Sequence, residues 1–257
     1  MLEEEAKNNI VEEDNIENNP PFKSMPGLKD WIYRLLIFLI GIIGLELVGF
    51  IIQLILAAIN LDYVTKDSPI FIQGLTIINS VRYIFIFIAI VAFLFPRIKY
   101  LLSRFKNWKH ILIGLGFGII VAALSELYFR VIGNFMVIED NVNEEYAQKM
   151  IAAYPVISVI SLGIIGPIVE EFTYRYGLFE CLKKKNKILA YIVTVLVFAF
   201  IHFNFDANIV NELLNIPAYL MSGLIITIAY DKFGLEASIA AHVFNNMLVI
   251  ILSIIGL

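Results

Sequence analysis

Charged side chains are scarce in this sequence: Asp, Glu, Lys and Arg make up 16% of its 257 residues. Soluble domains carry about a quarter charged residues, and a large core does not account for the 60% hydrophobic content found here. The formal net charge is −4 and no basic stripe is present, so we expect no nucleic-acid partner. A single cysteine, Cys181, excludes an intrachain disulfide.

The hydrophobic residues are gathered into long apolar blocks. Blocks of about 18 residues or more cross the hydrocarbon core of a bilayer as helices, because lipid offers the backbone no hydrogen-bond partners. We therefore predict an all-α fold, a polytopic transmembrane helical bundle of about seven spans (six to eight) in the lipid bilayer. The spans are expected at roughly 31–58, 73–96, 110–135, 152–182, 187–205, 209–230 and 235–256.

Positive charge alternates between the connections. Lys and Arg gather before the first span, at 97–109 and at 183–187, whereas the intervening loops are acidic or nearly uncharged. The positive-inside rule then predicts a cytoplasmic N-terminus. Residues 1–28 are acidic and Asn-rich, so we expect a disordered cytoplasmic tail before a helical membrane domain at 29–257. The Ile-, Asn- and Lys-rich usage indicates a prokaryotic protein, hence one in the plasma membrane.

Several ionisable side chains fall inside the predicted spans, where they are costly and are candidates for function. Glu126 and Arg130 are four residues apart and are expected to form an intrahelical ion pair. Glu46 and Arg82 are single charges in the first two spans, and pairing with each other is the favoured explanation. Glu212 lies near a predicted helix start, where a carboxylate suits the helix dipole.

The fourth predicted span contains two adjacent carboxylates, Glu170 and Glu171. Successive helical residues point about 100° apart, so the two carboxylates face different surroundings. Arg175 is four residues after Glu171, on the same face, and is expected to pair with it. This leaves Glu170 available for proton transfer as a general base.

Two histidines lie in later spans. His202 follows Phe198 by four residues, and His242 precedes Asn246 by four, so each pair shares a helical face. Glu170 is about 15 residues before the Lys-rich turn and His202 about 17 after it, which places both at one height in an antiparallel hairpin. We therefore expect one polar cluster within the bilayer, nearer its cytoplasmic side.

These residues form three motifs: EExxxR at 170–175, FxxxH at 198–202 and HxxxN at 242–246. In these motifs and their order the sequence resembles the CPBP family, the CAAX-processing and bacteriocin-processing intramembrane proteases, also called the Abi family. Each motif is weak by itself, and the combination with membrane placement is specific. The resemblance covers about 150–257, where we expect the peptidase core.

The resemblance implies an intramembrane endopeptidase that cleaves a membrane-associated peptide or protein substrate. Carried over residue by residue, it makes Glu170 the base that activates water, and His202 the group that positions and polarises that water. His242 and Asn246 would donate hydrogen bonds to the oxyanion of the tetrahedral intermediate. Prokaryotes generally lack the prenylation pathway, so a pheromone, a bacteriocin precursor or another membrane-tethered peptide is the expected substrate.

The surroundings of Glu170 leave two mechanisms open. In the resemblance, Glu171 and Arg175 hold the helix and tune Glu170. Glu170, His202 and His242 also offer a two-histidine, one-carboxylate set for a divalent metal such as Zn2+, although the sequence has no HExxH helix. A metal-free glutamate mechanism fits the same residues and needs no cofactor.

Two other functions compete with proteolysis. The first is a non-catalytic bacteriocin self-immunity or membrane scaffold protein of the same fold, because a fold does not prove an activity. Replacing Glu170 with alanine distinguishes this role from an enzyme. The second is a transporter that uses the polar residues as a relay, but the sequence shows no internal repeat, and the interruption at Gly166-Pro167 has no counterpart.

Overall fold

The computed structural model describes residues 30–256, which form helices and short connections without a strand in that range. The predicted all-α fold is therefore confirmed, and the predicted tail at 1–28 lies outside the described residues. The elements that build the bundle are, in chain order, α2 (Asp30–Ile59), η1 (Leu61–Tyr63), α3 (Phe71–Leu94), η2 (Phe95–Arg97), α4 (Ile98–Arg104), α5 (Trp108–Gly133), α6 (Val142–Ala153), α7 (Pro155–Ser158), η3 (Val159–Ile165), α8 (Gly166–Glu170), η4 (Glu171–Phe179), α9 (Glu180–Lys183), α10 (Lys187–Phe200), α11 (Ile209–Phe233) and α12 (Leu235–Ile255).

Six continuous helical stretches are long and apolar enough to cross a membrane. They are α2, α3 with α4, α5, the stretch Pro155–Lys183, α11 and α12. The fifth predicted span, 187–205, is the 14-residue helix α10, which at 1.5 Å per residue reaches only about 21 Å. It ends at Phe200 because the chain turns there toward α11, which Asn208 caps. The six stretches and the short α10 fall within the predicted six to eight.

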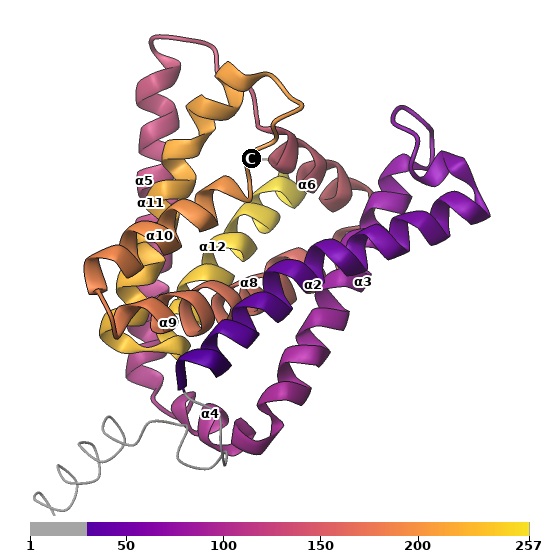
Figure 1. Cartoon of the computed structure of the whole chain (residues 1–257). Helices are drawn as coiled ribbons and strands as arrows, with labels where there is room; N and C mark the ends of the chain where they lie inside the picture. Colours follow the sequence, from indigo (N-terminus) through magenta and orange to yellow (C-terminus); the bar gives the residue numbers. More distant parts are fainter. Residues whose placement is uncertain (1–29, 257) are drawn as a thin grey trace, which may run out of the picture.

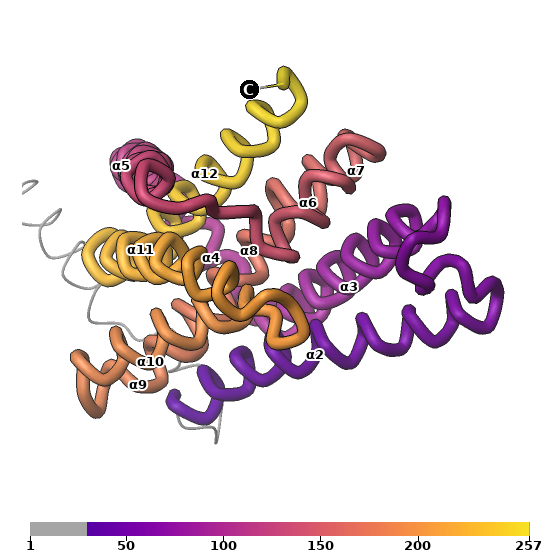
Figure 2. Tube along the Cα trace, turned by 90° about the horizontal axis from the view of Figure 1, so that it is seen from above, coloured from indigo at the N-terminus to yellow at the C-terminus, as the bar shows by residue number. Residues whose placement is uncertain are grey.

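The stretch Pro155–Lys183, called the central helix below, lies in the middle of the bundle. It packs against α2, α3, α10 and α12, and Figure 2 shows α8 between α2 and α3 on one side and α11 and α12 on the other. Every residue from Glu171 to Phe179 is buried. A helix buried on all sides can hold polar groups away from lipid, and the central helix is where the adjacent carboxylates lie.

Two segments of the central helix, η3 and η4, have π-helical rather than α-helical hydrogen bonding. Pro167 explains the first, because it lacks an N–H and its ring displaces the carbonyl of the preceding turn. The N–H of Gly166 accordingly donates to Ser161, five residues back, instead of Leu162. The sequence predicted a helix here but not its π-helical segments. Such segments are often found at functional sites.

Close helix contacts hold the elements around the central helix. A Cβ at position 41 of α2 would lie 1.9 Å from Oγ1 of Thr173, so a glycine is required there. A Cβ at position 118 of α5 would lie 2.7 Å from the carbonyl oxygen of Ala241 in α12. Small residues allow this backbone approach, as is usual between membrane helices. They fix α2 against the central helix two residues after Glu171, and α12 against α5 next to His242.

The short helix α6 was not among the predicted elements. Asn141 caps it by accepting a hydrogen bond from the N–H of Glu144 at 2.8 Å. Met150 and Ile151 are buried against the bundle, and α6 packs on α3 and α12. In Figure 1 it lies at the end of the bundle opposite α4 and α9, where it forms one wall of the cavity described next.

Candidate active site

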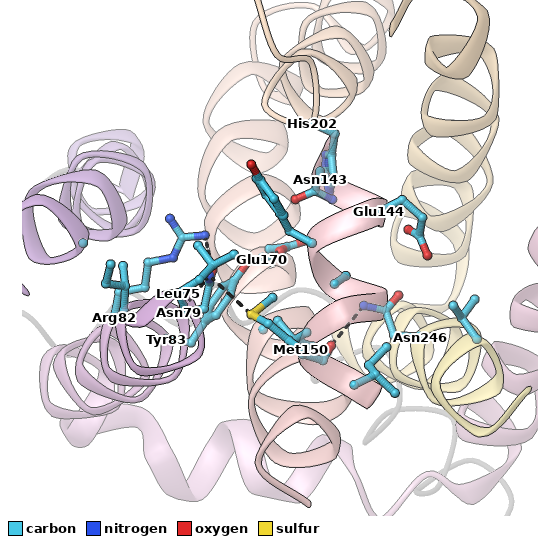
Figure 3. Close-up of a pocket in the computed structure, with 18 of the residues that line it drawn as sticks. Leu75, Asn79, Arg82, Tyr83, Asn143, Glu144, Met150, Glu170, His202 and Asn246 are labelled. Carbon is cyan, nitrogen blue, oxygen red and sulfur yellow. Dashed lines mark hydrogen bonds between the residues drawn. The ribbon is translucent and has the colours of Figure 1, made fainter. Parts of the chain in front are cut away.

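A cavity of about 590 Å³ lies between α2, α3, α6, the central helix, α11 and α12. Its lining includes all four predicted catalytic residues: Glu170, His202, His242 and Asn246. Figure 3 shows Glu170 near its centre, with His202 and Asn246 approaching from other elements. The structure thus brings together side chains that the sequence placed on three separate segments.

Glu170 is held by a residue that the sequence analysis did not single out. The hydroxyl of Tyr83, on α3, donates to Oε1 of Glu170 at 2.9 Å. The other oxygen, Oε2, lies 3.7 Å from Nε2 of His242. One oxygen of the carboxylate is therefore fixed, and the second faces an imidazole. Tyr83 is one of many aromatic residues in apolar spans and has no motif around it, so no local signal marked it.

The second carboxylate, Glu171, has different partners. Nη1 of Arg175 donates to Oε1 of Glu171 at 2.7 Å, and both side chains are fully buried. The predicted pair is confirmed. Nδ1 of His242 lies 2.8 Å from the same Oε1. Because the arginine favours the ionised carboxylate, Nδ1 of His242 must carry the hydrogen in this bond, and Nε2 is left facing Glu170.

His202 lies in the turn after α10, not within a helix as predicted. Its Nδ1 is 2.9 Å from the carbonyl oxygen of Phe198, which can only accept, so Nδ1 donates and Nε2 is the free ring nitrogen. The ring stacks on Tyr219 with centroids 4.4 Å apart. Phe198 contacts both histidine rings, with centroids 5.2 Å from His202 and 5.7 Å from His242. The phenylalanine of the FxxxH motif is therefore the spacer between the two imidazoles.

The turn that holds His202 is anchored by Glu212. This carboxylate is 1% exposed and accepts the N–H of Val142 at 3.1 Å and the N–H of Asn204 at 3.0 Å. Asn141 completes the link by donating from Nδ2 to the carbonyl of His202 at 3.3 Å. The predicted position of Glu212 near a helix start is confirmed. The structure adds that it joins the start of α6 to the turn beside the cavity.

Asn246 donates from Nδ2 to the carbonyl oxygen of Leu162 at 3.1 Å. In an α- or π-helical pattern that carbonyl would receive the N–H of Gly166 or of Pro167. Gly166 donates to Ser161 instead, and Pro167 has no N–H. Asn246 therefore supplies a donor that the backbone lacks, and one amide hydrogen remains for another acceptor.

The residues considered for zinc do not form a three-ligand site. In the described range 30–256, no group of three His, Cys, Asp or Glu side chains is arranged to hold a metal ion. His242 directs Nδ1 to Glu171 and His202 directs Nδ1 to a backbone carbonyl, while Glu170 is bonded to Tyr83. These bonds leave Nε2 of both histidines and Oε2 of Glu170 as the ligand atoms of the expected set, which lies in the cavity without forming a three-ligand group among the described residues.

The other predicted charge pairs have different outcomes. Glu126 and Arg130 form the expected pair on the exposed face of α5, with Nε and Oε1 2.5 Å apart. The predicted pair of Glu46 and Arg82 is wrong, because no ion pair within 4.0 Å joins them and Arg82 donates instead to Asn79 at 2.6 Å. Both side chains line the cavity.

The position of the cavity bears on two predictions about sidedness. The turn at 184–186 contacts the start of α2 through Lys184 and Asp30, so it lies at the N-terminal end of the bundle. In Figure 1 α6 lies at the opposite end, where it lines the cavity, and its cap Asn141 bonds the carbonyl of His202. A cytoplasmic N-terminus and a site nearer the cytoplasm therefore do not fit together, and both remain predictions.

Comparison with known proteins agrees with the motifs. Residues 152–248 match the family model described as type II CAAX prenyl endopeptidase Rce1-like. The chain is 26% identical over 203 residues to the UPF0177 protein YvdC of Lactococcus lactis subsp. lactis (strain IL1403), an alignment that covers 75% of this chain and 69% of that protein. No solved structure matches the chain significantly. The matched segment contains the three motifs, and over these residues the chain is similar to CAAX-type proteases.

Proposed function

We propose that the protein is an intramembrane endopeptidase that cleaves a membrane-associated peptide or protein with a water molecule activated by Glu170. The observation that carries this proposal is that two adjacent carboxylates have different partners. Glu171 is compensated by Arg175 in the protein interior. Glu170 faces the cavity with one oxygen held by Tyr83 and the other directed at His242. A general base needs this combination of fixed orientation and access.

The first step uses the gap between Glu170 and His242. Their facing atoms are 3.7 Å apart, too far for a direct hydrogen bond, and a water beside this gap reaches both. Glu170 accepts one proton of that water while the oxygen attacks the scissile carbonyl carbon. The carbonyl π electrons move to its oxygen, which becomes the oxyanion. His202 lies at the same cavity with Nε2 free to orient the water.

The oxyanion requires donors, and the neighbouring hydrogen bonds decide which groups can serve. Asn246 has one amide hydrogen bonded to Leu162 and a second available. His242 donates through Nε2 only after that nitrogen has taken a proton, since Nδ1–H is committed to Glu171. Preorganised donors of this kind are worth roughly a hundredfold or more in rate. Collapse of the intermediate breaks the C–N bond, and protonated Glu170 returns its proton to the leaving amine.

The size of the cavity limits the substrate. A volume of about 590 Å³ is that of a small-ligand pocket and holds a short extended segment rather than a folded domain. Glu170 lies halfway along the central helix, at membrane depth. Together these features support a membrane-associated peptide, or the exposed end of a membrane protein, as the substrate.

Comparative peptidomics tests the proposal. Cells that produce the wild-type protein are compared with cells that produce Glu170→Gln, which keeps the size of the side chain and removes the base. Glu126→Gln makes the same chemical change on the exposed face of α5 and is the matched control. We expect one or more peptides to be present with the wild type and Glu126→Gln and absent with Glu170→Gln. Identical peptide sets, at equal expression, would instead support the scaffold or immunity role.

A further inference from the structure

Arg82 carries a positive charge into the same cavity from α3. It lies eleven residues after Phe71, the first residue of that helix, and so about 17 Å along it. A cation at this depth is costly unless it is paired. Figure 3 shows Arg82 next to Tyr83 on the α3 side of the cavity, and Tyr83 is the residue bonded to Glu170.

The partners of Arg82 are weak for a charge in such a place. Nη2 donates to the neutral amide oxygen of Asn79 at 2.6 Å, and the guanidinium lies 5.3 Å from the ring centroid of Tyr83. Nε is buried and has no hydrogen-bond partner. Throughout residues 30–256, no carboxylate lies within 4.0 Å of this guanidinium. Arg82 therefore has hydrogen-bond donors and charge left over for a ligand.

The wall beside Arg82 leaves space for that ligand. A Cβ at position 49 of α2 would lie 3.4 Å from Cδ and 3.8 Å from Nη1 of Arg82, which is ordinary van der Waals contact, so the side chain of Arg82 lies along α2 beside Gly49. Glu46 lines the cavity one helical turn earlier on α2. The carboxylate of Glu46 is the nearby group that could compete for the guanidinium of Arg82, but the two do not form an ion pair.

We propose that Arg82 binds a carboxylate of the peptide substrate, which sets where the chain is cut. A guanidinium binds a carboxylate through two parallel N–H···O bonds, and in Arg82 Nη1 and the second hydrogen of Nη2 are the donors left for such a contact, because one hydrogen of Nη2 goes to Asn79 and Nε is buried. Because Tyr83 joins α3 to Glu170, a carboxylate on Arg82 lies only a few residues along an extended peptide from the attacked bond. The group is either the chain-terminal carboxylate or an Asp or Glu side chain. This inference rests on the proposed function and specifies its substrate.

Binding, measured without turnover, tests the inference. The full chain carrying Glu170→Gln is immobilised in detergent and offered pools of random nine-residue peptides with an N-terminal myristoyl group, prepared either as free acids or as C-terminal amides. Retained peptides are identified by mass spectrometry. We expect free acids to be retained about tenfold or more over amides, as a charge-assisted pair predicts. If a side-chain carboxylate is the ligand, amides rich in Asp or Glu are retained instead.

Further substitutions in the same background assign the selection to Arg82. Arg82→Gln should abolish it, and Arg82→Lys should keep only part of it, because lysine lacks the two-pronged geometry. Glu46→Gln should preserve or increase it by removing a competitor. Arg130→Gln, the matched change on the exposed face of α5, should leave it unchanged. Thermal unfolding of each variant shows whether it is folded. If Arg82→Gln does not fold, the test rests on Arg82→Lys.

Three outcomes would overturn the inference: no peptide retained, retention that ignores carboxylates, or carboxylate selection that survives both Arg82 substitutions. Failure of the proposed function gives a different result. In that case carboxylate peptides are retained through Arg82, but the wild-type protein does not cut them. The two proposals therefore fail separately.

Discussion

The hydroxyl of Tyr83 lies 2.9 Å from Oε1 of Glu170, although the two residues are 87 positions apart in the chain. Tyr83 is outside the segment 152–248 that matches the protease family. The first three long helices therefore do more than surround the matched segment, because α3 provides a direct hydrogen bond to the proposed base. The first of the five predictions that follow tests this contact.

Replacing Tyr83 with phenylalanine removes this hydrogen bond and keeps the ring. We expect peptide cleavage in proteoliposomes to slow by about tenfold or more, since Glu170 loses the donor that orients it. The melting temperature should change little. Tyr128→Phe is the matched control, because the hydroxyl of Tyr128 bonds the carbonyl of Leu214. Equal rates for the wild type and Tyr83→Phe would contradict an orienting role.

Replacing Arg175 with methionine leaves the fully buried Glu171 without its counter-charge. Breaking a buried ion pair in this way costs about 3–5 kcal/mol of folding stability. Thermal or denaturant unfolding in detergent measures the loss. The double variant with Glu171→Gln should recover part of it. Arg130→Gln, at the exposed pair with Glu126, should cost at most about 1 kcal/mol. If Arg175→Met lowered the folding stability by no more than Arg130→Gln does, the buried pair would have to be hydrated.

Replacing Glu212 with alanine removes the acceptor of two backbone N–H groups beside His202. Glu212 is a positioning residue, so we expect kcat to fall by about tenfold to a hundredfold with little change in KM. Glu212→Gln keeps one acceptor oxygen and should restore part of the rate. If the alanine variant lost stability but retained kcat, Glu212 would be purely structural.

Glu144, on α6, should make stability depend on pH. Burial raises the pKa of its carboxyl group, and the charge of Asp140 acts in the same direction. A raised pKa means that the folded state favours the neutral form, so this group stabilises the fold at low pH and that benefit is lost as pH rises through the folded pKa. Glu144→Gln should therefore raise the melting temperature at about pH 7 and leave it nearly unchanged at about pH 4. A uniform effect at both pH values would mean that ionisation of Glu144 is not responsible.

Labelling of single cysteines tests the sidedness of the bundle. In a Cys181→Ser background, we expect Lys185→Cys to react with an impermeant reagent from the cytoplasm, as the positive-inside rule predicts. Gln148→Cys, on α6 at the other end, should react from outside. The reverse pattern would place the end of the bundle with α6 and His202 at the cytoplasmic surface.

Contacts within one helix were accessible from the sequence. The spacing of four residues predicted the pairs of Glu171 with Arg175 and of Glu126 with Arg130, and both are present. Such pairs follow from the helical repeat, whatever surrounds the helix. The pairing of Glu46 with Arg82 required two helices to meet in a particular register, and that prediction was wrong.

The sequence by itself determined that the chain is a bundle of apolar helices, because block length and lipid leave the backbone no other way to satisfy its hydrogen bonds. It also marked the motif residues that gather at the cavity. Only the tertiary structure decided that Tyr83 donates a hydrogen bond to Glu170 and that Asn246 donates one to the carbonyl of Leu162. It also decided that Arg82 faces the cavity with no carboxylate as its partner. These relationships join different helices, and the depth and rotation at which helices pack depend on all their side chains together rather than on local spacing.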